Sequence, residues 1–311
     1  MKNYSWFTSI TLLLVLVMSA CTPQAASTPA QSASADGLIV TVSILPQQYF
    51  VERIGGERVK VNVMVAPGDS PHNYEPKPEQ MTALSQSAAY FSIGVDFEGA
   101  WLDKIAAANP NMLMVDTIAD VERLPMAAHS HEGEEDHDED EEHEEDGLDP
   151  HVWTSPELVK IMSQSIYAAL AQLDPDHQAE YQKNLDQFVQ EIDTLEAEIR
   201  QNLAGLEGKK FFVFHPAWGY FANDFGLEQI PIETGGTEPS AKELAALIDE
   251  ARHEGVRVIF VQPEMSTKAA ETIAAEIGGS VVPISPLAYD WMSNLSLVAE
   301  AFRDVLGQQG N

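Results

Sequence analysis

Residues 176–206 read DHQAEYQKNLDQFVQEIDTLEAEIRQNLAGL. Apolar side chains recur at every third or fourth position of this run, at Tyr181, Leu185, Phe188, Val189, Ile192, Leu195, Ile199 and Leu203. Because an α-helix turns once in about 3.6 residues, these side chains fall on one face. The spacing predicts a single amphipathic helix of roughly 28 residues, about 42 Å long. One small domain does not need a helix of this length, so we expect residues 174–207 to link two lobes.

The sequence on each side of this helix alternates strand and helix patterns. Before it, short apolar and β-branched runs predict strands at 38–45, 59–65, 88–93 and 112–115, and periodic stretches predict helices at 78–87, 97–108 and 156–173. After it, strands are predicted at 210–214, 229–234, 256–262 and 280–284, and helices at about 218–225, 240–254, 267–277 and 295–306.

Strands that alternate with helices favour parallel sheets with crossover helices. We therefore predict an α/β fold with two lobes, residues 38–173 and 208–311. Each lobe should hold a mostly parallel four-stranded sheet with flanking helices, and one long spine helix should join them.

The first 37 residues have the pattern of a targeting segment. Lys2 precedes an apolar run at Ile10–Met18, and small residues then lead to Cys21. The run is shorter than the roughly 20 residues that span a bilayer, so we expect residues 1–20 to be a signal peptide. The order resembles a bacterial lipobox, in which Cys21 carries a lipid and residues 21–37 form a flexible tether. The alternative is a plain signal peptide, with Cys21 left free or removed.

Composition excludes several classes of function. The formal net charge of −32 argues against nucleic acid as a partner, because phosphate binding needs Lys and Arg. It fits a protein that handles cations, although many acidic proteins do not. Cys21 is the one cysteine, so neither an intramolecular disulfide nor a thiolate zinc cluster can form. Any metal site must be built from His, Asp and Glu.

Residues 129–146 interrupt the alternating pattern. The run contains twelve acidic residues and four of the nine histidines, His129, His131, His137 and His143, and no apolar side chain. Such a run has nothing to bury, so we expect a disordered loop. It is either a solvated insertion without a specific role or a low-affinity zinc collector, since His-rich tracts can bind metal.

Three other histidines, His72, His151 and His215, share one position in the predicted fold. Each follows a predicted strand, and each has a proline beside it. Because ligands of open α/β sheets bind beyond the carboxyl ends of the strands, the three could meet across a cleft between the lobes. Three imidazoles suit Zn²⁺, Cu²⁺ or Ni²⁺ and leave a fourth position open. Taken singly, each histidine is better explained by a structural role.

Two carboxylates, Asp149 and Glu75, lie near these histidines in the sequence and could orient an imidazole. Alternatively, Asp149 could cap the following turn and Glu75 could lie on the surface. The neighbouring Trp153, Trp218 and Tyr220 are expected to pack rather than to act. His177 and His253 have charged neighbours and are expected at the surface.

The segments around the three histidines resemble the metal-ligand motifs of one family. They read GDSPHNYEPKP at 68–78, DPHVW at 149–153 and FHPAWGYF at 214–221. In this order they resemble the metal-binding components of ABC importers for zinc and manganese, the cluster A-I (cluster 9) solute-binding proteins, over about residues 38–306. The acidic run before the second segment also resembles a loop of zinc-specific members.

The resemblance implies two α/β lobes joined by a rigid helix, with His72, His151 and His215 as ligands of Zn²⁺. It implies a monomeric binding protein that delivers the ion to an ABC permease, held by lipid in the periplasm or on the outer cell surface, and no catalysis. Manganese-type members carry a carboxylate where His215 stands. Since Mn²⁺ favours oxygen ligands, nitrogen at this position favours zinc.

The chain departs from the family pattern at a fourth ligand. Many members carry Asp in an Asp-Pro-Leu motif after the last strand, whereas this chain reads Ser285-Pro286-Leu287. A neutral hydroxyl is a weak zinc ligand. Water, Asp290 or a histidine of the acidic run remain candidates for the fourth position, and we favour water or another small ligand.

Three other functions compete with zinc delivery. A zinc hydrolase could use three histidines and a metal-bound water, but the sequence has no HExxH motif and no clearly placed general base. A manganese-binding member and an adhesin of the same family are the remaining alternatives, and no separate motif supports an adhesin.

Overall fold

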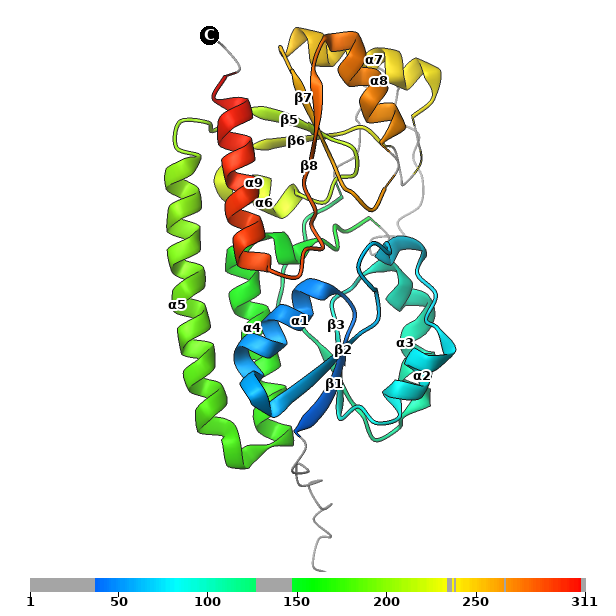
Figure 1. Cartoon of the computed structure of the whole chain (residues 1–311), viewed down its shortest axis with the longest axis vertical. Helices are drawn as coiled ribbons and strands as arrows, with labels where there is room; N and C mark the ends of the chain where they lie inside the picture. Colours follow the sequence, from blue (N-terminus) through cyan, green and yellow to red (C-terminus); the bar gives the residue numbers. More distant parts are fainter. Residues whose placement is uncertain (1–36, 127–146, 234–236, 238, 266, 309–311) are drawn as a thin grey trace, which may run out of the picture. The chain divides into compact units, whose positions relative to one another are not determined.

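The computed structural model describes residues 37–126, 147–233, 237, 239–265 and 267–308 (Figure 1). The predicted signal peptide, Cys21 and the acidic run with its four histidines therefore lie outside the described residues. Within the described part of the chain, no helix is both long enough and apolar enough to cross a membrane.

The N-terminal half contains a four-stranded sheet in the order β2-β1-β3-β4, and all its pairings are parallel. Its strands are β1 (Leu38–Val42), β2 (Val59–Val63), β3 (Ala89–Ser92) and β4 (Leu113–Asp116). Its helices are α1 (Leu45–Gly55), α2 (Pro78–Leu84), α3 (Asp96–Ala108) and α4 (Pro156–Leu173).

The C-terminal half repeats this plan, with the strand order β6-β5-β7-β8 and only parallel pairings. Its strands are β5 (Lys210–Val213), β6 (Glu228–Pro231), β7 (Val258–Val261) and β8 (Ser280–Pro283). Its helices are α6 (Gly219–Phe225), α7 (Ala241–His253), α8 (Lys268–Ile277) and α9 (Trp291–Leu306). The predicted α/β class with two parallel four-stranded sheets is confirmed.

The long helix α5 (Gln178–Asn202) has 25 residues and follows a 3₁₀ turn at Pro175–His177. It begins two residues later than predicted, because this turn precedes it. It packs against α1 and α4 of the N-terminal half and against α9 of the C-terminal half (Figure 1). Its six buried side chains, from Tyr181 to Ile199, belong to the predicted apolar stripe, whereas Val189 is half-buried and Leu203 follows the end of the helix. The helix therefore joins both halves, as expected.

Several element boundaries differ from the prediction by a few residues, and two of these differences have a local explanation. The predicted strand at 38–45 ends at Val42, and its last residue begins α1, with Pro46 in the first turn, where proline is well tolerated. Helix α9 begins at Trp291, four residues early, because the Asp290 carboxylate caps it by accepting a hydrogen bond from the Ser293 amide. In both cases a local capping feature sets the start of the helix.

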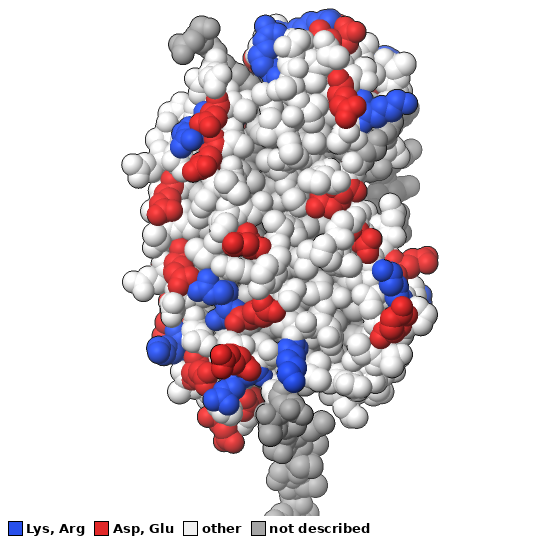
Figure 2. Space-filling model, viewed as in Figure 1, with Lys and Arg blue, Asp and Glu red and all other residues white. Residues whose placement is uncertain are grey.

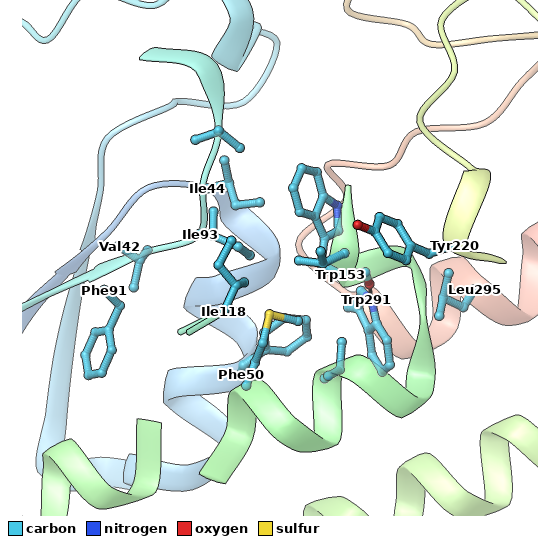
Figure 3. Packing of buried hydrophobic residues seen from close by; sticks show 14 of the residues in the cluster. Val42, Ile44, Phe50, Phe91, Ile93, Ile118, Trp153, Tyr220, Trp291 and Leu295 are labelled. Carbon is cyan, nitrogen blue, oxygen red and sulfur yellow. Dashed lines mark hydrogen bonds between the residues drawn. The ribbon is translucent and has the colours of Figure 1, made fainter. Parts of the chain in front are cut away.

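The main hydrophobic core contains residues from both halves. Near its centre, Trp291 of α9 packs edge-on against Phe50 of α1, with ring centroids 5.3 Å apart (Figure 3). The indole of Trp291 donates to the carbonyl oxygen of Trp153 at 2.7 Å, and that of Trp153 donates to the Pro286 oxygen at 2.8 Å. These buried donors tie the segment after His151 to the C-terminal half.

Charged side chains of both signs alternate on the face shown in Figure 2. Arg53 pairs with Glu191, and Lys160 pairs with Asp193 at 2.9 Å. Exposed pairs of this kind contribute at most about 1 kcal/mol each. The stability of the fold therefore comes mainly from the shared core.

Candidate metal centre

The fold brings His72, His151 and His215 together. His72 lies in a 3₁₀ turn, Pro71–Asn73, beyond β2, and His215 lies two residues beyond β5. His151 begins a second 3₁₀ turn, Val152–Thr154. One ligand atom from each histidine lies within 4.8 Å of the other two. The strand-end positions therefore meet, as the sequence predicted.

The spacing of the imidazoles suits one small ion. Their ring centroids lie 4.4 Å (His72 and His215), 5.0 Å (His151 and His215) and 5.9 Å (His72 and His151) apart. The Nε2 atoms of His151 and His215 are 3.2 Å apart. Two nitrogens on one tetrahedral Zn²⁺, at about 2.05 Å each, would be about 3.3 Å apart. This pair is therefore close to the spacing that zinc requires.

Each histidine is held by a different carboxylate through Nδ1. The Nδ1 of His72 is 2.6 Å from Asp96 Oδ2, that of His151 is 2.7 Å from Asp149 Oδ1, and that of His215 is 2.5 Å from Glu233 Oε1. A carboxylate accepts a hydrogen bond, so each Nδ1 carries the proton and donates. The Nε2 lone pair of each ring is thereby left for a metal.

Burial favours the neutral form of the His215 ring. His151 and His215 are 2% and 5% exposed, whereas the His72 side chain is 21% exposed. Burial lowers the pKa of His215, the hydrogen bond with Glu233 opposes this shift, and His151 adds to it. The hydrogen bond from His72 lowers the pKa of Asp96, so that carboxylate stays charged. Neutral imidazoles beside charged carboxylates are good metal ligands.

The backbone around His151 and His215 is also fixed by hydrogen bonds. Asp149 Oδ1 accepts from the His151 amide at 2.8 Å, and the Tyr220 hydroxyl donates to the Asp149 carbonyl at 2.8 Å. Gln262 donates to the His215 carbonyl at 2.8 Å. Tyr220 thus holds the site as well as packing in the core, a role that the sequence did not suggest.

Gly219 leaves the space that Asp149 occupies. A Cβ atom at position 219 would lie 2.7 Å from Asp149 Oδ2. Real Cβ atoms do not approach oxygen this closely, so a larger residue would displace the carboxylate. The glycine of the third motif is therefore explained by the close approach of Asp149.

The predicted orienting carboxylates are partly right. Asp149 orients His151 as expected, but Glu75 is exposed, and Asp96 instead holds His72. Sequence reasoning missed both Asp96 and Glu233. Asp96 begins α3 after β3, and Glu233 follows β6. The strand-end rule that selected the histidines could have selected these two as well.

The predicted candidates for a fourth ligand lie elsewhere or outside the described residues. Asp290 is exposed and caps α9, and it does not belong to the group of ligand atoms formed by the histidines. The Ser285 hydroxyl donates to Glu264 Oε1 at 2.7 Å. His129, His131, His137 and His143 lie outside the described residues. A cavity of about 20 Å³ is lined by the three histidines and Glu264, which is enough for one water, since a water needs about 10–15 Å³.

Known proteins resemble this chain in sequence and in fold. The family model described as "Zinc-uptake complex component A periplasmic" matches residues 40–304. The high-affinity zinc uptake system protein ZnuA of Bacillus subtilis is 30% identical over 276 residues, covering 88% of this chain and 85% of that protein. A crystal structure of ZnuA is 45% identical, with a TM-score of 0.79, and covers 87% of this chain and 100% of the other. A zinc-bound ZnuA deletion mutant matches at 45% identity with a TM-score of 0.78, covering 87% and 98%.

Proposed function

Because the chain belongs to the family of periplasmic zinc-uptake component A, we propose that it captures Zn²⁺ outside the cytoplasm and delivers it to the permease of an ABC importer. The observation that carries this proposal is the meeting of three imidazoles, each with a carboxylate on Nδ1 and with Nε2 left for a metal. In the proposal, His72, His151 and His215 are the protein ligands of the transported ion.

The donor set supports zinc rather than manganese as the transported ion. Three neutral imidazoles and one open position match the tetrahedral preference of Zn²⁺, whereas Mn²⁺ prefers oxygen donors. Cu²⁺ has the higher intrinsic affinity for nitrogen donors. Selection against copper would therefore depend on the geometry of the site and on the supply of each ion.

Release of the ion would begin at His72. His151 and His215 are buried, whereas His72 is partly exposed on a short turn, and its partner Asp96 has a side chain that is 54% exposed. A rigid α5 that packs against both halves opposes a wide opening. Movement of the 71–73 turn would free one ligand without separating the halves, and the permease could provoke it.

Two further parts of the proposal concern segments outside the described residues. Lipidation of Cys21 would hold the protein at the membrane surface, and mass spectrometry of the mature N-terminus would test it.

The acidic run at 129–146 would collect zinc weakly and pass it to the histidines. Its deletion should then lower uptake at scarce zinc while one tight site remains, and unchanged uptake would contradict the collector role.

Calorimetry of the full chain in detergent tests the histidine site. Wild type should bind one Zn²⁺ tightly at this site, and His72→Ala, His151→Ala and His215→Ala should each weaken it by at least tenfold. His253→Ala is the matched control, because this side chain is 86% exposed. If the three variants keep wild-type affinity, the assignment of these ligands is wrong. Turnover of ester, peptide or phosphate substrates by the zinc form would favour the hydrolase instead.

A further inference from the structure

Glu264 lies in the loop after β7, between two cavities. The smaller cavity, about 20 Å³, is lined by the three histidines. The larger one, about 300 Å³, is lined on its polar side by Asp69, Ser285 and Glu264. Glu264 and Leu287 line both cavities. A carboxylate therefore stands beside the proposed ligands, although the sequence patterns did not single it out.

The two carboxylate oxygens of Glu264 have different surroundings. Oε1 accepts a hydrogen bond from the Ser285 hydroxyl at 2.7 Å. Oε2 is buried and has no hydrogen-bond partner within the part of the chain that the structure describes, where it is the one carboxylate oxygen in this condition. An unpartnered buried carboxylate oxygen is costly, and folded proteins normally supply such a group with a partner.

The geometry limits what that partner can be. Glu264 does not belong to the group of ligand atoms that lie within 4.8 Å of one another, so its oxygens are too far from at least one histidine to share a metal with all three. Glu264 and the three histidines line the same small cavity, so a water on Zn²⁺ there, about 2.1 Å from the ion, could donate to a Glu264 oxygen over about 2.7 Å. Ser285 stands where many members of the family carry Asp, so the residue at this position supplies no carboxylate.

We propose that Glu264 accepts, through Oε2, a hydrogen bond from the water that fills the fourth position of bound Zn²⁺. The Ser285 hydroxyl holds Oε1 and so fixes the carboxylate. This inference rests on the proposed function, because it concerns the same ion. It assigns to Glu264 the negative charge near the fourth position that Ser285 lacks.

The test compares Glu264→Gln with Asp69→Asn in the full chain in detergent. Both changes remove one carboxylate, but Asp69 lines only the larger cavity. Competition with a zinc chelator should show roughly 10–100-fold weaker zinc binding for Glu264→Gln, as is typical when a partner of a metal ligand is lost, and less than about twofold for Asp69→Asn. Equal affinity of Glu264→Gln and wild type would overturn the inference.

Two further measurements separate this role from others. Without metal, Glu264→Gln should melt at or above the temperature of wild type, because it replaces a carboxylate of which one buried oxygen has no partner. A lower melting temperature would indicate a structural role and contradict the inference. With Co²⁺ as the probe, its visible spectrum should keep the band intensities of wild type, because the water remains bound. A spectrum that shows a lost protein ligand would overturn the water-mediated contact. If wild type itself binds no zinc tightly, the proposed function fails instead.

Discussion

The three carboxylates that hold the histidines differ in burial. Asp149 and Glu233 are 1% and 5% exposed, whereas the Asp96 side chain is 54% exposed. A hydrogen bond between buried partners is not weakened by competing water, and its loss leaves the imidazole without a partner. We therefore expect Asp149→Asn and Glu233→Gln to weaken zinc binding by roughly 10–100-fold, and Asp96→Asn to weaken it less. Chelator competition measures all three, and a larger effect at Asp96 would contradict the argument.

Gly219 provides a prediction that depends on space alone. In Gly219→Ala the new methyl group would meet Asp149 Oδ2 at 2.7 Å, so the carboxylate must move away from His151. Zinc affinity should fall by about tenfold, which is the low end for a displaced orienting carboxylate. Gly99→Ala is the control: this glycine lies in α3 with open space around it, and alanine there should stabilise the helix by about 0.5–1 kcal/mol without changing zinc affinity. Equal zinc affinity in both variants would show that Asp149 tolerates the methyl group.

The sequence predicted the three histidine ligands better than the carboxylates that hold them. The histidines could be found because each comes after a predicted strand, and ligands of open α/β sheets bind beyond the carboxyl ends of the strands. Asp149 could be found because it is two residues from His151. Asp96 and Glu233 also follow strands, but they are 24 and 18 residues from their histidines, and the sequence does not show which histidine each carboxylate contacts.

Helix α3 is positioned by a buried carboxylate in its first turn. Glu98 accepts hydrogen bonds from the amides of Ile93 at 3.0 Å and Gly94 at 2.8 Å, and from the Ser43 hydroxyl. These bonds fix the turn between β3 and α3, and Asp96 begins α3 directly after that turn. Burial raises the pKa of Glu98 to about 7, although its hydrogen bonds act in the opposite direction. The support of His72 thus includes a group that titrates near neutral pH.

The raised pKa of Glu98 predicts a specific pH dependence of stability. Between pH 4.5 and about 7 the Glu98 carboxyl has lost its proton in the unfolded chain but keeps it in the native chain. The contribution of Glu98 to the free energy of unfolding therefore falls as pH rises through this window and is constant outside it. Gln at position 98 cannot ionise, so the free energy of unfolding of Glu98→Gln does not fall for this reason. The stability of the variant minus that of wild type should therefore rise across the window, by up to about 3 kcal/mol, and then level off. Denaturant unfolding at several pH values measures it, and a difference independent of pH would refute the assignment.

Most elements could be predicted, but one helix could not. The strands show runs of apolar and β-branched residues, and the sequence at α4 and α5 has clear helical periodicity. Helix α1 follows β1 after only Ser43 and Ile44. The apolar run of the strand continues into Leu45, so the pattern alone does not show where the strand ends. Packing of Phe50 against α5 and α9 decides it.

The arrangement of the whole molecule was predictable in outline only. The length of α5 indicated that it joins two lobes, and the alternating patterns indicated two parallel sheets. The shared strand order, β2-β1-β3-β4 and β6-β5-β7-β8, has no visible counterpart in a sequence repeat. The contacts that join the halves, such as Trp291 with Trp153 and Trp153 with Pro286, connect residues more than 130 positions apart. No local pattern predicts such pairs.

Zinc should stabilise the whole molecule, because its proposed ligands come from both halves. His72 follows β2, His215 follows β5, and His151 lies in the segment that Trp153 ties to the C-terminal half. An ion that binds only the folded chain at about 100 times its Kd adds about 2.7 kcal/mol. For a chain of this size that raises the melting temperature by about 4–5 °C. Calorimetric melting should show this rise in wild type and His253→Ala.

The rise should be lost in His151→Ala and His215→Ala, and a chelator should reverse it in wild type. His72→Ala should keep part of it, because two buried imidazoles with oriented Nε2 atoms remain. Because one hydrophobic core contains residues of both halves, the protein should unfold in a single thermal transition with and without zinc. Two separate transitions, of which zinc shifts only one, would show that the ion binds within one half and would contradict a site shared between them.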